Sequence, residues 1–309
     1  MAQIHDKKDS ADAGQTSRTT LPRWRQVLGS LRYRDYRLVW ATSILSSGAR
    51  WIQQISLGWL AFDLTGSPVL LGSILFVYQA PSVVLSPLVG VLVDRMDRRQ
   101  LLIFSQLAMA VFAVLLALDI ALGYLEIWHL YIFALISGVE STIIHVVRQA
   151  LIPSVVPRDS LMNAIALNSA ALTSTRIFGP ALAGILIVAL GVEGNFILQA
   201  VLLTGVALAA FPLNITPPKR ESIENTGSAS LWQEIAVGLR FIWGIGTLRV
   251  LFIVQFVMMF VAMPFSNFLP VWAADVLALD ADGLGLLYSA AGIGALLGTM
   301  SLAAAGNVQ

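Results

Sequence analysis

Long apolar runs separated by short polar or Gly/Pro-rich breaks dominate this chain of 309 residues. A helix of about 20 apolar residues crosses a hydrocarbon layer about 30 Å thick, and eight runs are of this order of length. They cover residues 38–62, 70–93, 101–122, 128–147, 162–190, 195–213, 249–273 and 284–305. The pattern predicts an all-α integral membrane protein with eight spans.

The longest break begins at Asn214 and separates six spans from two. Its Pro, Ser, Asn and charged residues are typical of a linker. The stretch LWQEIAVGLRFIW within it is apolar on one side, which predicts a helix lying along the membrane surface. We therefore expect four parts: a tail over 1–36, a six-helix bundle over 37–213, a linker with an interfacial helix over 214–248, and a partial bundle over 249–309.

The composition supports a membrane protein and argues against an enzyme. Charged residues make up only 12% of the chain, against about 25% in a soluble domain. Because the chain has no cysteine, disulfides and thiolate metal sites are excluded. The three histidines, His5, His129 and His145, lie far apart, and no loop carries a Ser/His/Asp set or a phosphate-binding glycine loop. We expect no enzymatic activity, no cofactor, no metal site and no nucleic-acid partner.

The basic residues predict how the chain crosses the membrane. All Lys and Arg residues except Arg50 and Arg176 fall in the tail or in breaks on one side of the spans, with Arg148 counted as a loop charge. The opposite breaks contain Asp and Glu but no Lys or Arg. By the positive-inside rule the N-terminus and the linker are cytoplasmic, in a multi-pass protein of the inner (plasma) membrane.

The two groups of spans resemble each other weakly. A shift of 212 residues lays Arg37 on Arg249 and Asp63 on Asp275, so each unit starts on a basic residue and its first span ends on an aspartate. Parallel duplication of a six-helix unit is a transporter architecture. Alternatively, any two amphiphilic hairpins align this well. A full second unit would extend past Gln309, so we expect the chain to be C-terminally truncated.

The break between the second and third spans reads GVLVDRMDRRQ. It resembles the signature of the major facilitator superfamily, with an aspartate, Asp97, where a glycine is usual. The matching residues, which form a conformational gate motif in that family, are Gly90, Asp94, Arg95, Arg98 and Arg99. The resemblance is to the drug and siderophore exporter branch, similar to the enterobactin exporter and macrolide efflux proteins. It implies the major facilitator fold, here a complete six-helix half plus the first two helices of the second half.

The fifth span contains RIFGPALAG, which resembles the antiporter motif of the same family. The matching residues are Gly179, Pro180 and Gly184, while Ala183 replaces one glycine. Thr175 stands where an earlier glycine of the motif is expected, so the match is partial. The resemblance implies a transporter of the antiporter type.

The first span carries a charge near its centre. Ser43, Ser47, Arg50 and Gln54 follow at spacings of four, three and four, which places them on one helix face. A central arginine facing lipid costs at least about 2.5 kcal/mol. We therefore expect this face to point into the bundle, towards a water-accessible cavity.

Two other charges reach similar depth: Glu140 in the fourth span and Arg176 in the fifth. Together with Arg50 and Gln54 they are our candidates for substrate binding and proton coupling. The alternative is a structural ion pair between Glu140 and one arginine. We interpret His145 as a packed helix residue rather than a proton relay.

These features predict proton-coupled export of small amphipathic molecules, of drug or siderophore type, by alternating access. The expected partners are a small-molecule substrate, protons and the lipid bilayer, with the protein acting as a monomer. Two alternatives stay open: an uptake transporter of the same fold, and a truncated membrane protein, or remnant, that transports nothing.

Overall fold

The computed structural model describes residues 29–213, 240–241, 243–254, 257, 268–279, 283–284, 286–288, 290–291, 293–294 and 297–298. Most of the predicted tail and linker lies outside these ranges. The predicted interfacial helix, and much of the seventh and eighth spans, are therefore not described.

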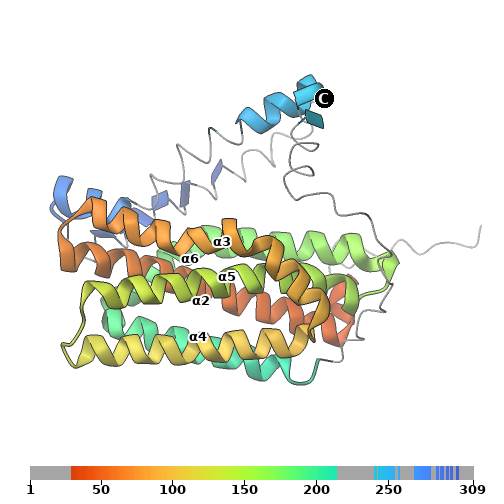
Figure 1. Ribbon diagram of the computed structural model, residues 1–309, viewed down its shortest axis with the longest axis horizontal. Coiled ribbons are helices and arrows are strands. Elements are labelled where there is room, and N and C mark those ends of the chain that lie inside the picture. Colours follow the sequence, from red (N-terminus) through yellow and green to blue (C-terminus); the bar gives the residue numbers. More distant parts are fainter. Residues whose placement is uncertain are drawn as a thin grey trace, which may run out of the picture.

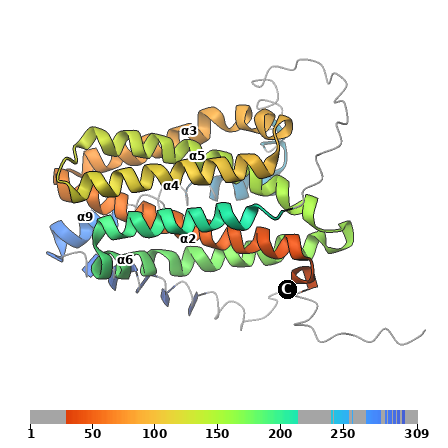
Figure 2. The same cartoon turned by 90° about the horizontal axis from the view of Figure 1, so that it is seen from below.

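The described chain is built from helices, which confirms the all-α prediction. A short 3₁₀ helix, η1 (Gly29–Arg32), precedes α2 (Arg34–Thr65), α3 (Pro68–Arg95), α4 (Arg98–Ala121), α5 (Ile127–Val155) and α6 (Arg158–Ala210). Near the C-terminus a short α9 (Leu269–Val271) continues into a π turn, η2 (Trp272–Val276). Helices α2 to α6 run side by side along the long axis of the molecule (Figures 1 and 2).

The turn between α2 and α3 shows how the sequence sets helix ends. Gly66 adopts φ 57°, a left-handed conformation that favours glycine, and its N–H donates to the carbonyl of Phe62. The Ser67 side chain then accepts from the Leu70 N–H, and Pro68 takes the first position of α3. Proline suits that position because its missing N–H would have no partner there. Two residues are enough to reverse the chain.

Helix α6 is a hairpin of two limbs. As a straight helix its 53 residues would extend about 80 Å, far beyond a bilayer. Gly191 breaks it with φ 73° and ψ 172°. The Asn195 side chain donates to the carbonyl of Ala183 at 3.3 Å, so the limbs on either side of Gly191 lie against each other. Figure 2 shows them as the green and teal ribbons.

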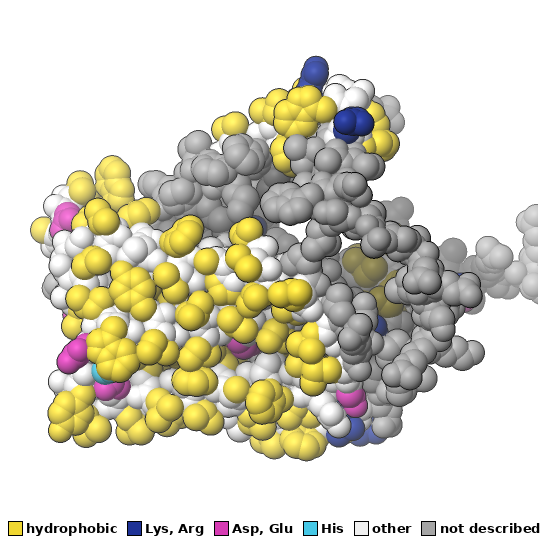
Figure 3. All heavy atoms as spheres, viewed as in Figure 1, with side chains coloured by type: hydrophobic (Ala, Val, Ile, Leu, Met, Phe, Trp, Pro, Cys, Tyr) yellow, Lys and Arg dark blue, Asp and Glu magenta, His cyan; other side chains and the backbone are white. Residues whose placement is uncertain are grey.

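The outer surface of the bundle is apolar. By length and composition, four of the described helices could cross a membrane, over Pro68–Ser86, Arg98–Ala121, Ile127–Val155 and Arg158–Ala210. Large apolar side chains point outward from them, with Val83 80% and Phe104 74% exposed. Figure 3 shows such side chains covering the face formed over α3 to α5. This arrangement fits a membrane protein.

Helix α2 does not belong to that apolar group, because hydroxyl, amide and guanidinium groups run along it. It can be polar because it is enclosed. It packs against α3, α5, α6, η1 and α9, and polar residues such as Ser43, Gln53 and Ser56 are buried. A helix shielded from lipid by its neighbours needs no continuous apolar surface.

The two ends of the bundle carry opposite charge. One end, here called the acidic end, holds Asp63, Asp119 and Glu126, and the other, the basic end, holds Arg34, Arg37, Arg98, Arg99 and Arg158. In Figure 3 acidic side chains gather towards the left of the bundle and basic ones at its lower right. The prediction that the basic end is cytoplasmic stays a prediction.

Candidate functional site: a charged central cavity

Helix α2 and the first limb of α6 lie parallel and in a constant register. The Tyr36 hydroxyl donates to the carbonyl of Ala164 at 2.8 Å, and the Ser47 and Thr175 hydroxyls lie 2.8 Å apart, both pairs 128 residues apart in sequence. The same offset pairs Trp51 with Gly179. There a Cβ added to the glycine would lie only 2.4 Å from the indole Cδ1. Gly179 therefore lets the two helices approach closely.

This register places Arg50 and Arg176 at nearly the same depth. By the 128-residue offset Arg50 is level with Phe178, two residues beyond Arg176. Two residues correspond to about 3 Å along a helix. Both arginines line a cavity of about 790 Å³ in the bundle, the central cavity.

The polar face predicted for the first span reaches this cavity. Ser47, Arg50 and Gln54 all line it. Ser43 does not, because it is buried and its hydroxyl donates to the carbonyl of Val39 at 2.8 Å. Sequence spacing alone thus identified the face of α2 that meets the cavity.

Other helices complete the cavity wall. Tyr78 and Gln79 come from α3, and Pro180 comes from α6. His145 of α5 also lines it and lies 2.9 Å from the amide nitrogen of Gln149, so our interpretation of it as a packed residue is wrong. From the C-terminal part, Pro270, Tyr288 and Ala291 contribute. The cavity therefore lies between the 29–213 bundle and the C-terminal segments.

Glu140 lies behind the cavity rather than in its lining. Its side chain is only 8% exposed, and the amide nitrogen of Gln106 on α4 donates to its Oε1 at 2.5 Å. Arg50 and Arg148 lie within electrostatic range of its carboxylate. Among the residues that the structure describes, none forms an ion pair with Glu140 closer than 4.0 Å. Glu140 is thus a buried acid held by one amide and two more distant cations.

The structure corrects the expectation for Arg148. It belongs to α5, which continues to Val155, and it is only 8% exposed. Its Nη2 is buried without a hydrogen-bond partner in the described chain. Arg148 is therefore a buried arginine near Glu140, not a loop charge. Sequence analysis placed the end of the fourth span just before Arg148, because Arg148 is charged, but α5 continues past it.

The second limb of α6 adds a polar seam that sequence analysis missed. The Gln199 side-chain nitrogen donates to Gln53 Oε1 at 2.7 Å, and Asn195 donates to the Ser56 hydroxyl at 3.0 Å. All four residues are buried. The available signal was the spacing of Asn195 and Gln199, four residues apart within an apolar run. Gln106 is likewise a polar residue within the apolar run of the third span.

The gate motif lies at the basic end, where α3 passes into α4. Asp97 caps α4, since its carboxylate accepts from the Arg99 N–H at 2.8 Å. This role needs no glycine, so the departure from the family signature is accommodated. The Arg98 guanidinium donates to the carbonyl of Ala150 on α5 at 3.1 Å. Gly90 lies in α3, and nothing lies within 4 Å of a Cβ added there. The structure describes the backbone of Asp94 and Arg95 but not their side chains.

The motif of the fifth span faces both α2 and the cavity. Gly179 provides the close approach to Trp51, and Pro180 lines the central cavity. Gly184 is buried one turn further along α6. The motif thus lies at a close contact between α2 and α6 beside the cavity.

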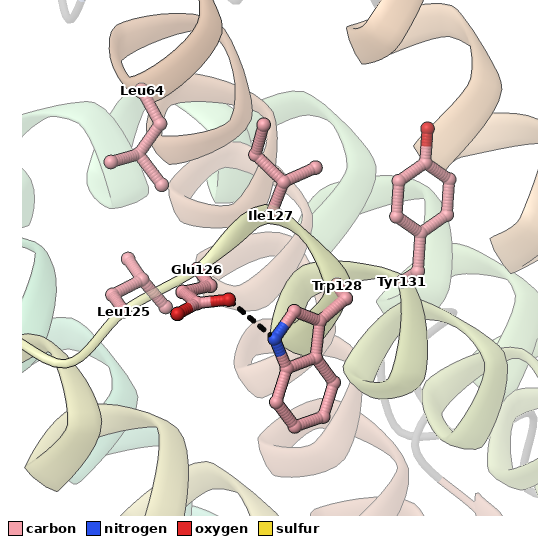
Figure 4. A pocket seen from close by; sticks show the side chains of 6 residues that line it. All are labelled: Leu64, Leu125, Glu126, Ile127, Trp128 and Tyr131. Atoms are coloured by element: carbon pink, nitrogen blue, oxygen red, sulfur yellow. Dashed lines mark hydrogen bonds between the residues drawn. The ribbon is translucent and has the colours of Figure 1, made fainter.

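A second, shallower pocket lies at the acidic end (Figure 4). It measures about 560 Å³ and is lined by Leu64, Leu125, Glu126, Ile127, Trp128 and Tyr131. The Trp128 indole N–H donates to the Glu126 carboxylate at 2.8 Å across it. Next to it the His129 Nδ1 pairs with Asp119 at 2.5 Å. These polar contacts close the turn between α4 and α5 on the rim of the bundle.

An apolar exterior around a charged internal cavity defines a class, the multi-pass membrane transporters. Comparison with known proteins gives the family. Residues 26–306 match the family described as transmembrane secretion effector. The chain belongs to this family of major facilitator transporters, which confirms the superfamily inferred from the gate motif.

Several relatives are similar over much of the chain. The staphyloferrin A transporter of Staphylococcus aureus is 25% identical over 263 residues, 85% of this chain and 65% of the relative. Macrolide efflux protein A of Streptococcus pyogenes is 24% identical over 283 residues, 90% of this chain and 69% of the relative. A transporter of Bacillus subtilis is 27% identical over 190 residues, 59% of this chain and 44% of the relative. The chain thus spans under two thirds of the first and third of these relatives.

Proposed function

We propose that this protein carries a small amphipathic molecule across a membrane through the central cavity, by alternating access. The observation that carries the proposal is the position of the cavity. It lies between the bundle of residues 29–213 and the segments that contain Pro270 and Tyr288. A site between two halves that rock against each other is exposed first to one side of the membrane and then to the other.

The proposed halves follow the predicted domains. Residues 37–213 form the first six-helix half, 214–248 the linker, and 249–309 the first two helices of the second half. Apolar packing supports a functional contact between the halves, since Ile52 and Ile55 of α2 pack in one buried cluster with Leu269 and Tyr288. The protein would act as a monomer in the bilayer, with the basic end cytoplasmic.

Glu140 is the proposed proton-coupling residue. A buried carboxylate without a close cation is costly when ionised, whereas its protonated form is not. Arg50, which lines the cavity, lies within electrostatic range of it, so the charge of Glu140 is felt at the binding site. A change in protonation would alter the balance between the two access states. Export is proposed from the similarity to a relative named as a macrolide efflux protein.

Cysteine labelling tests the mechanism without a known substrate, because the chain has no native cysteine. Leu172 on α6 lines the cavity, whereas Leu182 on the same helix is 56% exposed on the outer surface. In membrane vesicles of either orientation, Leu172→Cys should react with an impermeant maleimide from both sides. Leu182→Cys, in lipid, should react from neither.

The same assay tests proton coupling. The ratio of the two labelling rates of Leu172→Cys should change between pH 6 and pH 8, by roughly twofold or more, and adding Glu140→Gln should remove that change. Labelling from one side alone would contradict alternating access. A pH response that survives Glu140→Gln would assign that residue to structure. Accumulation rather than depletion of a transported compound in expressing cells would assign uptake.

A further inference from the structure

The described wall of the central cavity carries positive charge and no carboxylate. Arg50 and Arg176 line it at nearly the same depth. In the described chain neither guanidinium makes a hydrogen bond or an ion pair, so both are available to a ligand. Two guanidinium groups at nearly the same depth can both donate hydrogen bonds to one oxyanion, such as a carboxylate.

Two C-terminal stretches of the sequence offer no acid to neutralise these charges. From Arg249 to Ala274, and again from Gly283 to Gln309, the sequence contains no Asp or Glu. Glu140 lies within electrostatic range of Arg50, but it does not line the cavity and is held by Gln106 behind the wall. Its carboxylate also lies within electrostatic range of Arg148, a buried cation. Among the residues that the structure describes, the cavity and its surroundings therefore hold more arginines than carboxylates.

The remaining wall is apolar and aromatic. Trp51, Ile55, Leu75 and Ile177 line it beside the arginines, and Tyr78 adds a ring with a hydroxyl. A cavity of about 790 Å³ lies within the range that holds drug-sized molecules. The wall thus fits a molecule with an apolar body and an anionic head.

We propose that the central cavity selects amphipathic carboxylates, whose anionic group binds between Arg50 and Arg176 while the apolar body packs on Trp51 and its neighbours. This inference rests on the proposed transport function and names its substrate class. A site of this kind would not bind lipophilic cations, because Arg50 and Arg176 would repel them.

Three naphthalenes with one body and different heads test the charge preference: 2-naphthoate, 2-naphthalenemethanol and 2-naphthylmethylammonium. Binding to the intact chain in lipid nanodiscs is measured by competition with radiolabelled 2-naphthoate at pH 7. The carboxylate should bind at least about tenfold more tightly than the alcohol, because only the carboxylate forms charge-assisted hydrogen bonds with the guanidinium groups. The ammonium compound should not compete.

Variants assign the preference to the cavity. Arg50→Gln and Arg176→Gln should each weaken 2-naphthoate binding roughly tenfold and leave the alcohol unchanged. Arg50→Lys, which keeps the charge, should retain a preference for the carboxylate. The matched control is Arg158→Gln, at the exposed start of α6, which should change nothing.

Equal or tighter binding of the alcohol or the ammonium compound overturns the inference, as does absence of 2-naphthoate binding at about 1 mM. Loss of alcohol binding in the Arg50→Gln and Arg176→Gln variants would also overturn it, by showing a general structural role. The proposed function fails separately, through the labelling of Leu172→Cys. If that residue is labelled from both sides while 2-naphthoate does not bind, alternating access stands and the carboxylate preference falls.

Discussion

Helix α2 meets α6 through hydroxyl and amide groups, whereas α4 meets α5 mainly through apolar side chains. The first contact includes Ser47 with Thr175 and Gln53 with Gln199, all inside the bundle. The second buries Met109 and Ala113 against Leu130 and other apolar side chains. Its polar contacts are the Gln106–Glu140 bond, a weak bond from the Ser137 hydroxyl to the Met109 sulfur at 3.7 Å, and links near the two ends of the helices.

The difference follows from exposure to lipid. Helix α4 has an outward face, with Phe104 and Val111 largely exposed, so it must be apolar there. Helix α2 is surrounded by protein and can use directional bonds. Apolar packing tolerates small shifts between helices, but a hydrogen bond is lost over about an ångström. The α2–α6 contact therefore fixes the register of the two helices that present Arg50 and Arg176.

The largest expected effect comes from filling the close approach in the α2–α6 contact. Gly179→Ala should destabilise the fold by about 1 to 3 kcal/mol, because the new methyl group meets the Trp51 ring. Unfolding in detergent measures the loss. Gly205→Ala on the second limb is the control, since nothing lies within 4 Å of its added Cβ, and it should be neutral or slightly stabilising. Equal losses in both variants would contradict a special contact at Gly179.

A smaller effect is expected in the polar seam. Gln199→Leu should cost about 1 to 2 kcal/mol, because it leaves the buried Gln53 amide oxygen without its donor. Replacing both glutamines by leucine should restore part of the loss, since no buried amide is then left unpaired. Unfolding of the single and double variants, compared as a cycle, measures the coupling. Strict additivity would show that the bond contributes nothing.

The smallest effect is expected at the acidic end of the α4–α5 contact. Asp119→Asn removes the carboxylate that contacts the His129 ring, a contact that is an ion pair only when the ring is protonated, and both side chains are 23% exposed. Such partly exposed pairs contribute at most about 1 kcal/mol. The difference in unfolding free energy should shrink further at about 1 M salt, where charges are screened beyond about 3 Å. A salt-independent loss larger than the loss in Gln199→Leu would reverse the order of the two contacts.

Sequence alone predicted those features that depend on periodicity and missed those that depend on neighbours. The spacing of Ser47, Arg50 and Gln54 identified the cavity face of α2 because the three positions share one side of a helix. The burial of Arg148 could not be predicted, because hydropathy marks a charge as the end of a span. Which helix packs behind Glu140, and so its bond with Gln106, depends on the arrangement of the bundle. Periodicity does not contain that information.

The tight reversal at Gly191 has a consequence for how the chain enters the membrane. With no extended polar loop between them, the two limbs of α6 would insert together as a hairpin. Asn195 follows the turn, and its side chain can donate to the carbonyl of Ala183 on the preceding limb in place of water. This bond lies within α6, so it can form before the limb packs against Ser56 of α2. A polar side chain is thus covered early, when an uncovered amide in lipid would cost several kcal/mol. The positive φ of Gly191 therefore serves insertion into the membrane as well as the shape of the bundle.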